Sequence, residues 1–121
     1  MLKNDFFTFT ALQLEGDMVT TNIELNAAHS IFKGHFPGQP IVPGVCMMQM
    51  VKEITEDYIS RKIKLVKASD LKFLSFVNPD QGESIAMKLK INMEGELVRV
   101  DARLLNETTV LFKFKGIFGI K

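Results

Sequence analysis

The feature that most constrains the fold of this chain is a segment rich in glycine and proline that leads directly into a helical pattern. Three glycines and three prolines lie between positions 34 and 44, where the apolar periodicity of the flanking sequence disappears. Glycine permits backbone conformations that other residues avoid and proline fixes φ, so this segment is expected to be an irregular but locally rigid loop. The chain therefore changes from one type of secondary structure to another across this loop.

A helix is predicted to begin at Pro43, because a proline in the first helical turn loses no hydrogen bond. Apolar residues then recur at helical spacing, at Met47, Met50, Val51, Ile54 and Tyr58. The other side of the predicted helix is polar and carries Gln49, Lys52, Glu53, Glu56 and Asp57. This pattern predicts an amphipathic helix that packs one face against a sheet and exposes the other.

Strand-like sequence lies on both sides of this helix. Two runs precede it, at 6–14 and 18–25, and Glu15-Gly16-Asp17 between them is predicted to form a hairpin turn. Four runs follow it, at 64–77 (interrupted by Asp70), 83–93, 97–105 and 108–117. Their alternating apolar residues indicate one buried face. Two strands, a helix and four strands predict a single α+β domain over residues 1–121, with one helix wrapped by a curved antiparallel sheet.

Composition excludes several classes of protein. The chain has 15 Lys and Arg against 14 Asp and Glu, so it lacks the strong positive field of a dedicated nucleic-acid binder. Its start contains polar and acidic residues and resembles neither a signal peptide nor a membrane span, which predicts a cytoplasmic protein. A single cysteine, Cys46, excludes an internal disulfide and a cysteine-cluster metal site, and we expect it to be a small core residue.

Residues 31–45 have the sequence IFKGHFPGQPIVPGV. This segment resembles the active-site motif of the β-hydroxyacyl-acyl-carrier-protein dehydratases of the FabZ/FabA type. Lys72-Phe73 and the residues 77–80 resemble the strand and turn that follow the helix in the same family. The resemblance extends from about Phe6 to Phe118, and the motif at 31–45 is its most specific part.

The resemblance implies a hot-dog fold that assembles as a dimer or as a higher oligomer of dimers. It implies a (3R)-hydroxyacyl substrate on the phosphopantetheine arm of acyl-carrier protein, from which water is eliminated to give a trans-2-enoyl thioester. It implies no metal and no organic cofactor. The sequence leaves open the length of the acyl chain, the pathway, and the choice of acyl-carrier protein over coenzyme A.

The reaction requires a base for the C2 proton, a proton donor for the departing hydroxyl, and donors for the thioester oxygen. The family's catalytic histidine corresponds to His35, and Phe36 beside it is assigned to substrate binding. The amides of Gly44 and Val45, at the start of the helix, are expected to meet the thioester oxygen. The other histidine, His29, has no counterpart in the motif and is expected to lie on the surface.

The family's helix carboxylate corresponds to Gln49, which departs from the pattern. An amide can orient a hydroxyl or a water, but it cannot deliver a proton as a carboxylic acid does. Glu53 follows one turn later on the same helix face, so the usual order of Glu then Gln is reversed in this chain. One hypothesis is that Glu53 supplies the acid through a bridging water; the alternative is that both residues lie on the polar face of the helix.

Two further functions remain open. A thioesterase on the same fold would use Gln49, with or without Glu53, to position a hydrolytic water. A non-catalytic acyl-carrier-binding or partner subunit would keep the backbone of the motif after the chemistry is lost. Lysines at 33, 62, 64, 67 and 72 could receive an acidic carrier protein, although a solvated face is the ordinary interpretation of such lysines.

Overall fold

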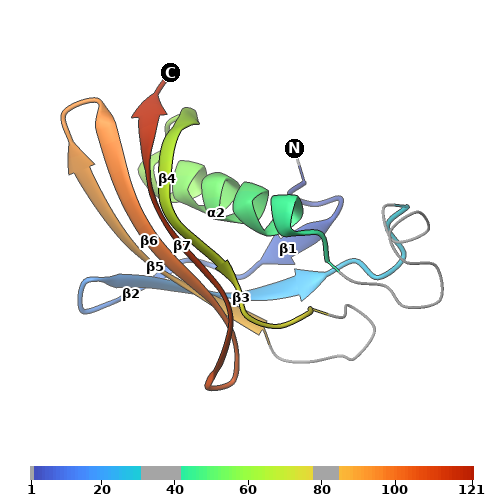
Figure 1. Cartoon of the computed structure of the whole chain (residues 1–121). Helices are drawn as coiled ribbons and strands as arrows, with labels where there is room; N and C mark the ends of the chain where they lie inside the picture. Colours follow the sequence, from blue (N-terminus) through green and yellow to red (C-terminus); the bar gives the residue numbers. More distant parts are fainter. Residues whose placement is uncertain (1, 31–41, 78–84) are drawn as a thin grey trace.

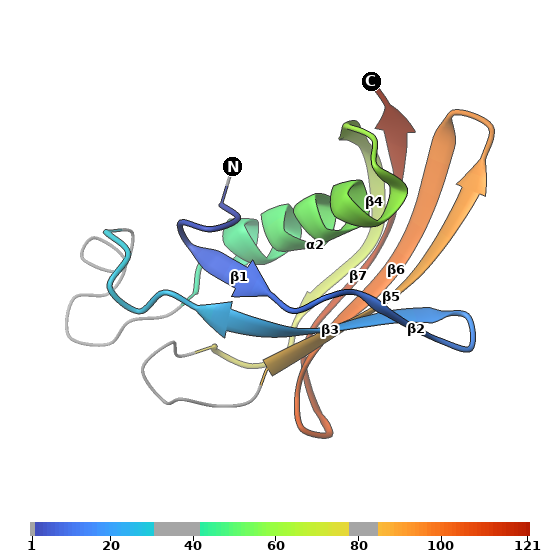
Figure 2. The same cartoon turned by 180° about the vertical axis from the view of Figure 1, so that it is seen from behind.

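The structure, a computed structural model, describes residues 2–30, 42–77 and 85–121. In these residues a curved antiparallel sheet wraps around a long helix, α2 (Gly44–Ile59), which lies in the concave side of the sheet (Figures 1 and 2). The predicted α+β hot-dog architecture is therefore confirmed. Within the same residues no helix is long and apolar enough to cross a membrane.

The described residues form seven strands that belong to one sheet. Their bounds are β1 Phe7–Phe9, β2 Gln13–Glu15, β3 Met18–Leu25, β4 Ile63–Phe73, β5 Ile85–Glu94, β6 Leu97–Asn106 and β7 Thr109–Ile120. The strand order is β1-β3-β5-β6-β7-β4, and β2 pairs with β3 beside β1. Every pairing is antiparallel. The strand β4 therefore lies at one edge of the sheet, next to the C-terminal strand.

The sequence predicted one continuous strand over residues 6–14. This prediction is wrong, because the structure divides the segment into β1 and β2. Both pieces pair with β3, and next to β1 side chains add to the backbone bond that the N–H of Thr10 donates to the carbonyl of Asn22 at 3.0 Å. The hydroxyl of Thr10 accepts the N–H of Asn22 at 3.0 Å, and the hydroxyl of Thr21 donates to the carbonyl of Thr10 at 2.8 Å. The chain therefore leaves the sheet at Thr10 and rejoins it at Gln13.

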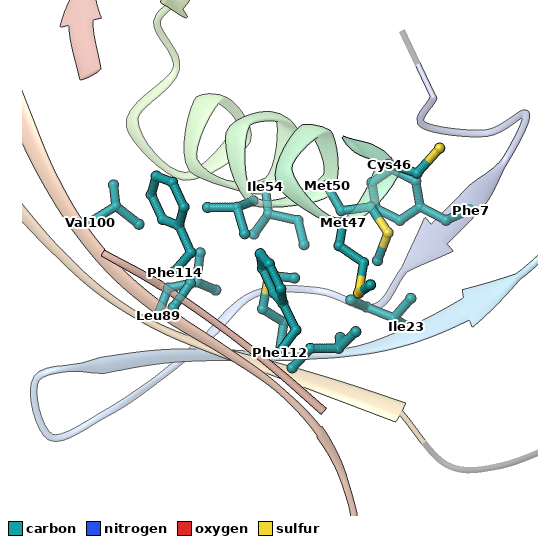
Figure 3. Packing of buried hydrophobic residues seen from close by; sticks show 14 of the residues in the cluster. Phe7, Ile23, Cys46, Met47, Met50, Ile54, Leu89, Val100, Phe112 and Phe114 are labelled. Atoms are coloured by element: carbon teal, nitrogen blue, oxygen red, sulfur yellow. The ribbon is translucent and has the colours of Figure 1, made fainter. Parts of the chain in front are cut away.

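The helix begins after Pro43, as predicted, and ends at Ser60, which adopts a left-handed conformation with φ 57°. Its apolar face lies over the sheet and buries Cys46, Met47, Met50, Val51 and Ile54 (Figure 3). These side chains pack against apolar residues of the central strands, among them Leu89, Val100, Phe112 and Phe114. Figure 3 shows the phenylalanine rings of β7 pointing from the sheet toward the helix.

The predicted faces of the helix need three corrections. Tyr58, expected in the apolar stripe, is 42% exposed, whereas Glu53 and Glu56, expected on the solvated face, are only 2% and 8% exposed. Glu56 accepts the N–H of Ile63 at 2.9 Å and so ties the last turn of α2 to the start of β4. A buried carboxylate requires donors of this kind, and here they come from backbone outside the helix, which folds against the surface that was expected to be solvated.

The interruption predicted at Asp70 is confirmed as an irregularity within β4. Its register against β7 shifts between Ala68 and Asp70, and it shifts again between Leu65 and Lys67. A further shift in the β6–β7 pairing places Leu111 in the buried core, beside Phe112, while Val110, which the alternation with Phe112 and Phe114 would place on the buried face, is half-buried. Of the residues 77–80, which resemble a strand and turn of the family, 78–80 lie outside the described residues.

Candidate active site

The first turn of α2 has two backbone donors that are not used by the helix. The N–H groups of Cys46 and Met47 bond to the carbonyl of Pro43 at 3.0 and 3.3 Å. Those of Gly44 and Val45 have no acceptor among residues 2–30, 42–77 and 85–121, and no side chain caps the helix. Because the first turn also holds no acidic residue, the positive end of the helix dipole is open to a ligand oxygen.

Gly44 is required by packing as well as by the expected approach of a ligand. A Cβ built on Gly44 would lie 2.6 Å from the ring of Phe73, which is closer than any real contact. The ring of Phe73 also stacks on Phe112, with centroids 5.2 Å apart. The sequence points to Phe73 only through the family resemblance. Nothing in the sequence indicates that β4 contacts the start of α2, so the position of Phe73 over Gly44 was not predicted.

Gln49 and Glu53 are joined by a hydrogen bond. The Nε2 of Gln49 donates to the Oε2 of Glu53 at 2.9 Å. An ionised carboxylate only accepts hydrogen bonds, so the amide of Gln49 must turn its nitrogen toward Glu53. The Oε1 of Gln49 therefore points away from Glu53, so Gln49 can offer this acceptor to a ligand, together with the second N–H of its amide.

The carboxylate of Glu53 also holds the start of the chain. It accepts the N–H of Leu2 at 2.9 Å on Oε2 and 3.1 Å on Oε1, and the N–H of Lys3 at 2.8 Å on Oε1. Every one of these contacts, and the one from Gln49, comes from a donor. Glu53 therefore anchors the N-terminal segment to α2 through both of its acceptor oxygens.

Two of the predicted site residues, His35 and Phe36, lie outside the described residues. The others are on α2, with Gly44 and Val45 in its first turn and the bonded pair of Gln49 and Glu53 in the following turns.

His29, predicted to be a surface residue, is half-buried instead. Its side chain is 16% exposed, and its ring meets the ring of Phe6 edge to face. Its Nε2 lies 3.1 Å from Asp5. These contacts give His29 a structural position near the N-terminal strand.

Cys46 is a core residue, as predicted, and is 4% exposed. Burial raises the pKa of its thiol, so the reactive thiolate is disfavoured at neutral pH. Within the described residues no group of three His, Cys, Asp or Glu side chains is placed to hold a metal ion.

Comparison with known proteins identifies the family. The model of the ApeI-like family, described as ApeI dehydratase, matches residues 11–112. The chain belongs to the ApeI-like dehydratase family. The match includes the motif segment, the whole of α2, the strands β2 to β6 and the first four residues of β7.

Curated relatives of this ApeI-like chain carry dehydratase names. It is 26% identical over 95 residues to the 3-hydroxyacyl-acyl-carrier-protein dehydratase FabZ of Caulobacter vibrioides, which covers 71% of this chain and 50% of that protein. It is 30% identical over 86 residues to the FabZ of Lactiplantibacillus plantarum, which covers 65% of this chain and 54% of that protein. The chain thus spans about half the length of the curated relatives it matches.

Solved structures agree on the fold of this ApeI-like chain. The dehydratase heterocomplex ApeI:P from Xenorhabdus doucetiae superposes with a TM-score of 0.72 at 18% identity, over 92% of this chain and 96% of that chain. A hypothetical thioesterase from Streptococcus pneumoniae, solved with coenzyme A, gives a TM-score of 0.64 at 8% identity, over 95% of this chain and 85% of that chain. At these identities the similarity establishes the hot-dog fold alone.

A Glu53→Gln variant of this ApeI-like protein tests the anchor. Glutamine keeps the shape of Glu53 but has one acceptor oxygen, so it cannot satisfy both the N-terminal amides and Gln49. A buried donor without an acceptor costs about 1–3 kcal/mol, and we expect the free energy of unfolding in urea to fall by that amount. Amide hydrogen exchange at Leu2 and Lys3 should accelerate.

The matched control for this measurement is Asp57→Asn. Asp57 lies one turn further along α2 and makes an exposed ion pair with Lys3 at 3.2 Å. Loss of such a pair costs about 0–1 kcal/mol. Equal losses in the two variants would contradict the role of Glu53 as a buried anchor.

Proposed function

We propose that this ApeI-like protein is a dehydratase that eliminates water from a (3R)-hydroxyacyl thioester carried by acyl-carrier protein, or by coenzyme A, in fatty-acid or related acyl-chain biosynthesis in the cytoplasm. The observation that carries the proposal is the open start of α2, which directly follows the motif segment containing His35. Two free amides, of Gly44 and Val45, are suited to bind the thioester oxygen.

The proposed reaction uses groups of the protein alone. His35 takes the proton from C2, and the electron pair of the C–H bond moves onto the thioester, where the amides of Gly44 and Val45 stabilise the enolate oxygen. The C2=C3 bond then forms as the C3–O bond breaks. Phe36 lies beside His35 in the sequence and is assigned to contact the acyl chain.

Protonation of the departing hydroxyl is the step in which this chain departs from the family pattern, because Gln49 stands where the pattern has a carboxylate. Gln49 presents Oε1, which accepts a hydrogen bond from the substrate hydroxyl and so orients it. We assign the return of the proton to His35, which holds the proton taken from C2 and would complete the release of water. In this assignment Glu53 positions Gln49. In the alternative assignment, Glu53 donates the proton to the departing hydroxyl through a bridging water.

Exchanging the pair separates these assignments. In Gln49→Glu/Glu53→Gln the hydrogen bond is kept with its direction reversed, and the carboxylic acid moves to the position it has in the family. General acid catalysis contributes about 10²–10⁴ in rate, so we expect enoyl formation, followed by ultraviolet absorbance, to rise by a factor in that range.

The single variant Gln49→Glu is the control for this exchange. It places two carboxylates side by side, so their repulsion should lower stability to urea. A double variant no faster than the wild type would contradict the proposed role of position 49. A Glu53→Gln variant that abolishes turnover while keeping the fold would favour Glu53 as the acid.

The product of the reaction distinguishes the proposed dehydratase from its alternatives. A thioesterase is the second candidate, because the acceptor of Gln49 could also hold a hydrolytic water. We expect purified protein incubated with a short 3-hydroxyacyl-acyl-carrier-protein to form the enoyl thioester, and His35→Ala to reduce this rate by about 10²–10⁴. Free thiol without enoyl product would establish a thioesterase, and the absence of both products would favour a carrier-binding or partner subunit.

A dimer is the proposed assembly, and the edge strand β4 is the surface we assign to it. Large apolar side chains on and after this strand are exposed, namely Leu65, Val66, Leu71, Phe73, Leu74 and Phe76. The outer backbone groups of β4 pair with no strand in the described residues. A second copy that adds its own β4 would cover both the apolar side chains and the open edge.

Light scattering after size-exclusion chromatography tests the dimer. We expect twice the chain mass of 13.7 kDa for the wild type. We expect Phe76→Glu to shift the protein toward the monomer, because a charge would be buried at the interface. Leu14→Glu, at a side chain 63% exposed on β2, is the control and should leave the dimer intact. A monomeric wild type would overturn the assignment, unless a homologous subunit co-purifies in its place.

A further inference from the structure

The middle of α2 carries a positive charge beside the candidate active site. Met48, Gln49 and Lys52 are half-buried and Val45 is 73% exposed, whereas the helix residues between them are buried. Positions three, four and seven apart share one face of a helix, so these four side chains lie together. We call them the open face of α2. Lys52 is the one charged residue of this face, and Gln49 is its neighbour.

Lys52 has no counter-charge within the part of the chain that the structure describes. Its ammonium group makes no ion pair and no hydrogen bond with residues 2–30, 42–77 or 85–121. Lys3, by contrast, bonds Asp57 of the same helix at 3.2 Å and lies 4.9 Å from the centre of the Phe9 ring. A half-buried charge without a partner loses hydration and gains no attraction in return, so Lys52 does not stabilise the fold as Lys3 does.

The two carboxylates next to Lys52 on the helix are occupied elsewhere. Glu53 accepts the side-chain N–H of Gln49 and two backbone N–H groups of the N-terminal segment. Glu56, four positions after Lys52, is 8% exposed and accepts the N–H of Ile63 at 2.9 Å. A lysine four positions before a glutamate is also the less favourable order for a helical ion pair. The helix therefore leaves the charge of Lys52 to a ligand.

The geometry of a helix directs Lys52 toward Gln49. Long side chains in a helix point back toward its N-terminus and cover the preceding turn. For Lys52 that turn holds Met48 and Gln49, and the amides of Gly44 and Val45 lie beyond it. Cβ atoms three positions apart are about 5–6 Å from each other, a distance that the flexible four-carbon stem of a lysine spans. The ammonium group can therefore meet an atom that is held by Oε1 of Gln49.

We propose that Lys52 is a catalytic residue whose ammonium group donates a hydrogen bond to the departing C3 oxygen. This inference rests on the proposed function, because it adds a residue to the proposed elimination. As the C3–O bond breaks, its electron pair moves onto the oxygen, and a nearby cation stabilises the negative charge that develops there. Oε1 of Gln49 accepts the hydrogen of the hydroxyl, which leaves the lone pairs of the oxygen to a donor. Lys52 keeps its proton, and the proton that completes water comes from His35.

A cation beside Gln49 compensates for the absence of a carboxyl group at position 49. A carboxylic acid assists the departing oxygen by giving it a proton, which an amide cannot do. An ammonium group assists the same oxygen by electrostatic attraction, which is stronger in a partly buried site than in water. In this chain Gln49 then orients the hydroxyl and Lys52 stabilises its departure.

The test is the steady-state rate of enoyl formation from a short 3-hydroxyacyl-acyl-carrier-protein by the full chain and its Lys52 variants. Lys52→Met keeps the length of the stem and removes the charge. Removal of one donor that stabilises a developing negative charge costs about 10²–10³ in kcat, so we expect a loss in this range with KM unchanged. Lys52→Arg keeps a cation and should retain most of kcat.

Three results would overturn the proposal. The first is a wild-type kcat in Lys52→Met. The second is an unchanged kcat with a raised KM, because Lys52 would then attract the acidic carrier rather than act on the departing oxygen. The third is an equal loss of kcat in Lys52→Met and Lys52→Arg, because the charge would then not be the property that matters.

Stability to urea separates this role from a structural one. Lys52→Met removes an unpaired charge from a half-buried site, so we expect its unfolding midpoint to be equal to or higher than that of the wild type. A clearly lower midpoint would show that Lys52 supports the fold and would contradict the assignment.

The matched control is Arg61→Met, which removes the same charge at a different place. Arg61 is exposed, lies beyond the end of α2, and makes no ion pair or hydrogen bond with the described residues. We expect kcat to change by less than about twofold, because an exposed charge away from the site is screened by solvent and salt. Equal losses in Arg61→Met and Lys52→Met would mean that net charge governs the rate, and the proposal would be wrong.

The role of Lys52 and the proposed function are distinguished by the same assay. If the wild type forms no enoyl product, or releases only free thiol, the dehydratase fails and the role of Lys52 fails with it. If the wild type forms the enoyl product and Lys52→Met forms it with the same kcat, the dehydratase stands and the role of Lys52 does not.

Discussion

The carboxylate of Glu53 connects α2 to the start of the chain, at Leu2 and Lys3, which are 51 and 50 positions away in the sequence. It lies in the middle of α2, is 2% exposed, and accepts hydrogen bonds from the backbone of Leu2 and Lys3 and from the side chain of Gln49. A buried charge is tolerated only where donors surround it, so the N-terminal segment must close over the helix for the fold to be complete. The same contact determines which atom of Gln49 is free. Stability and the chemistry of the candidate site thus depend on one side chain.

Local pattern predicted the helix and most of the strands, because the spacing of apolar residues shows which face of each element is buried. The helical spacing of Met47, Met50, Val51 and Ile54 and the proline before them predicted α2 closely. The burial of Glu53 and Glu56 was not predictable in the same way, since their partners are backbone groups of Leu2, Lys3 and Ile63 whose position depends on the folded sheet. The division of the first strand at Thr10 likewise depends on side-chain bonds to β3.

The sequence predicted which residues belong to the candidate site, but not how their side chains and amides are arranged. The motif and the helix start pointed to Gly44 and Val45, and the structure adds that their amides have no acceptor in the described residues. Two features could be found only in the structure. They are the contact of Phe73 with Gly44 and the direction of the hydrogen bond between Gln49 and Glu53. The strand register is a still clearer case, because Lys88, Arg103 and Lys113 lie directly opposite one another on β5, β6 and β7 although 15 and 10 positions separate them along the chain.

The reversed order of Gln49 and Glu53 changes the group that the site offers to a ligand but leaves the fold around it the same. A hydrogen bond between an amide and a carboxylate one turn apart can form whichever of the two residues supplies the amide, so either order can join positions 49 and 53. What differs is the group left for the ligand. The family order presents a carboxyl group, whereas this chain presents the amide oxygen of Gln49 and uses its carboxylate to hold the N-terminal segment. In the proposed reaction the start of the helix keeps its role at the thioester oxygen, and the supply of a proton to the departing hydroxyl is assigned to His35.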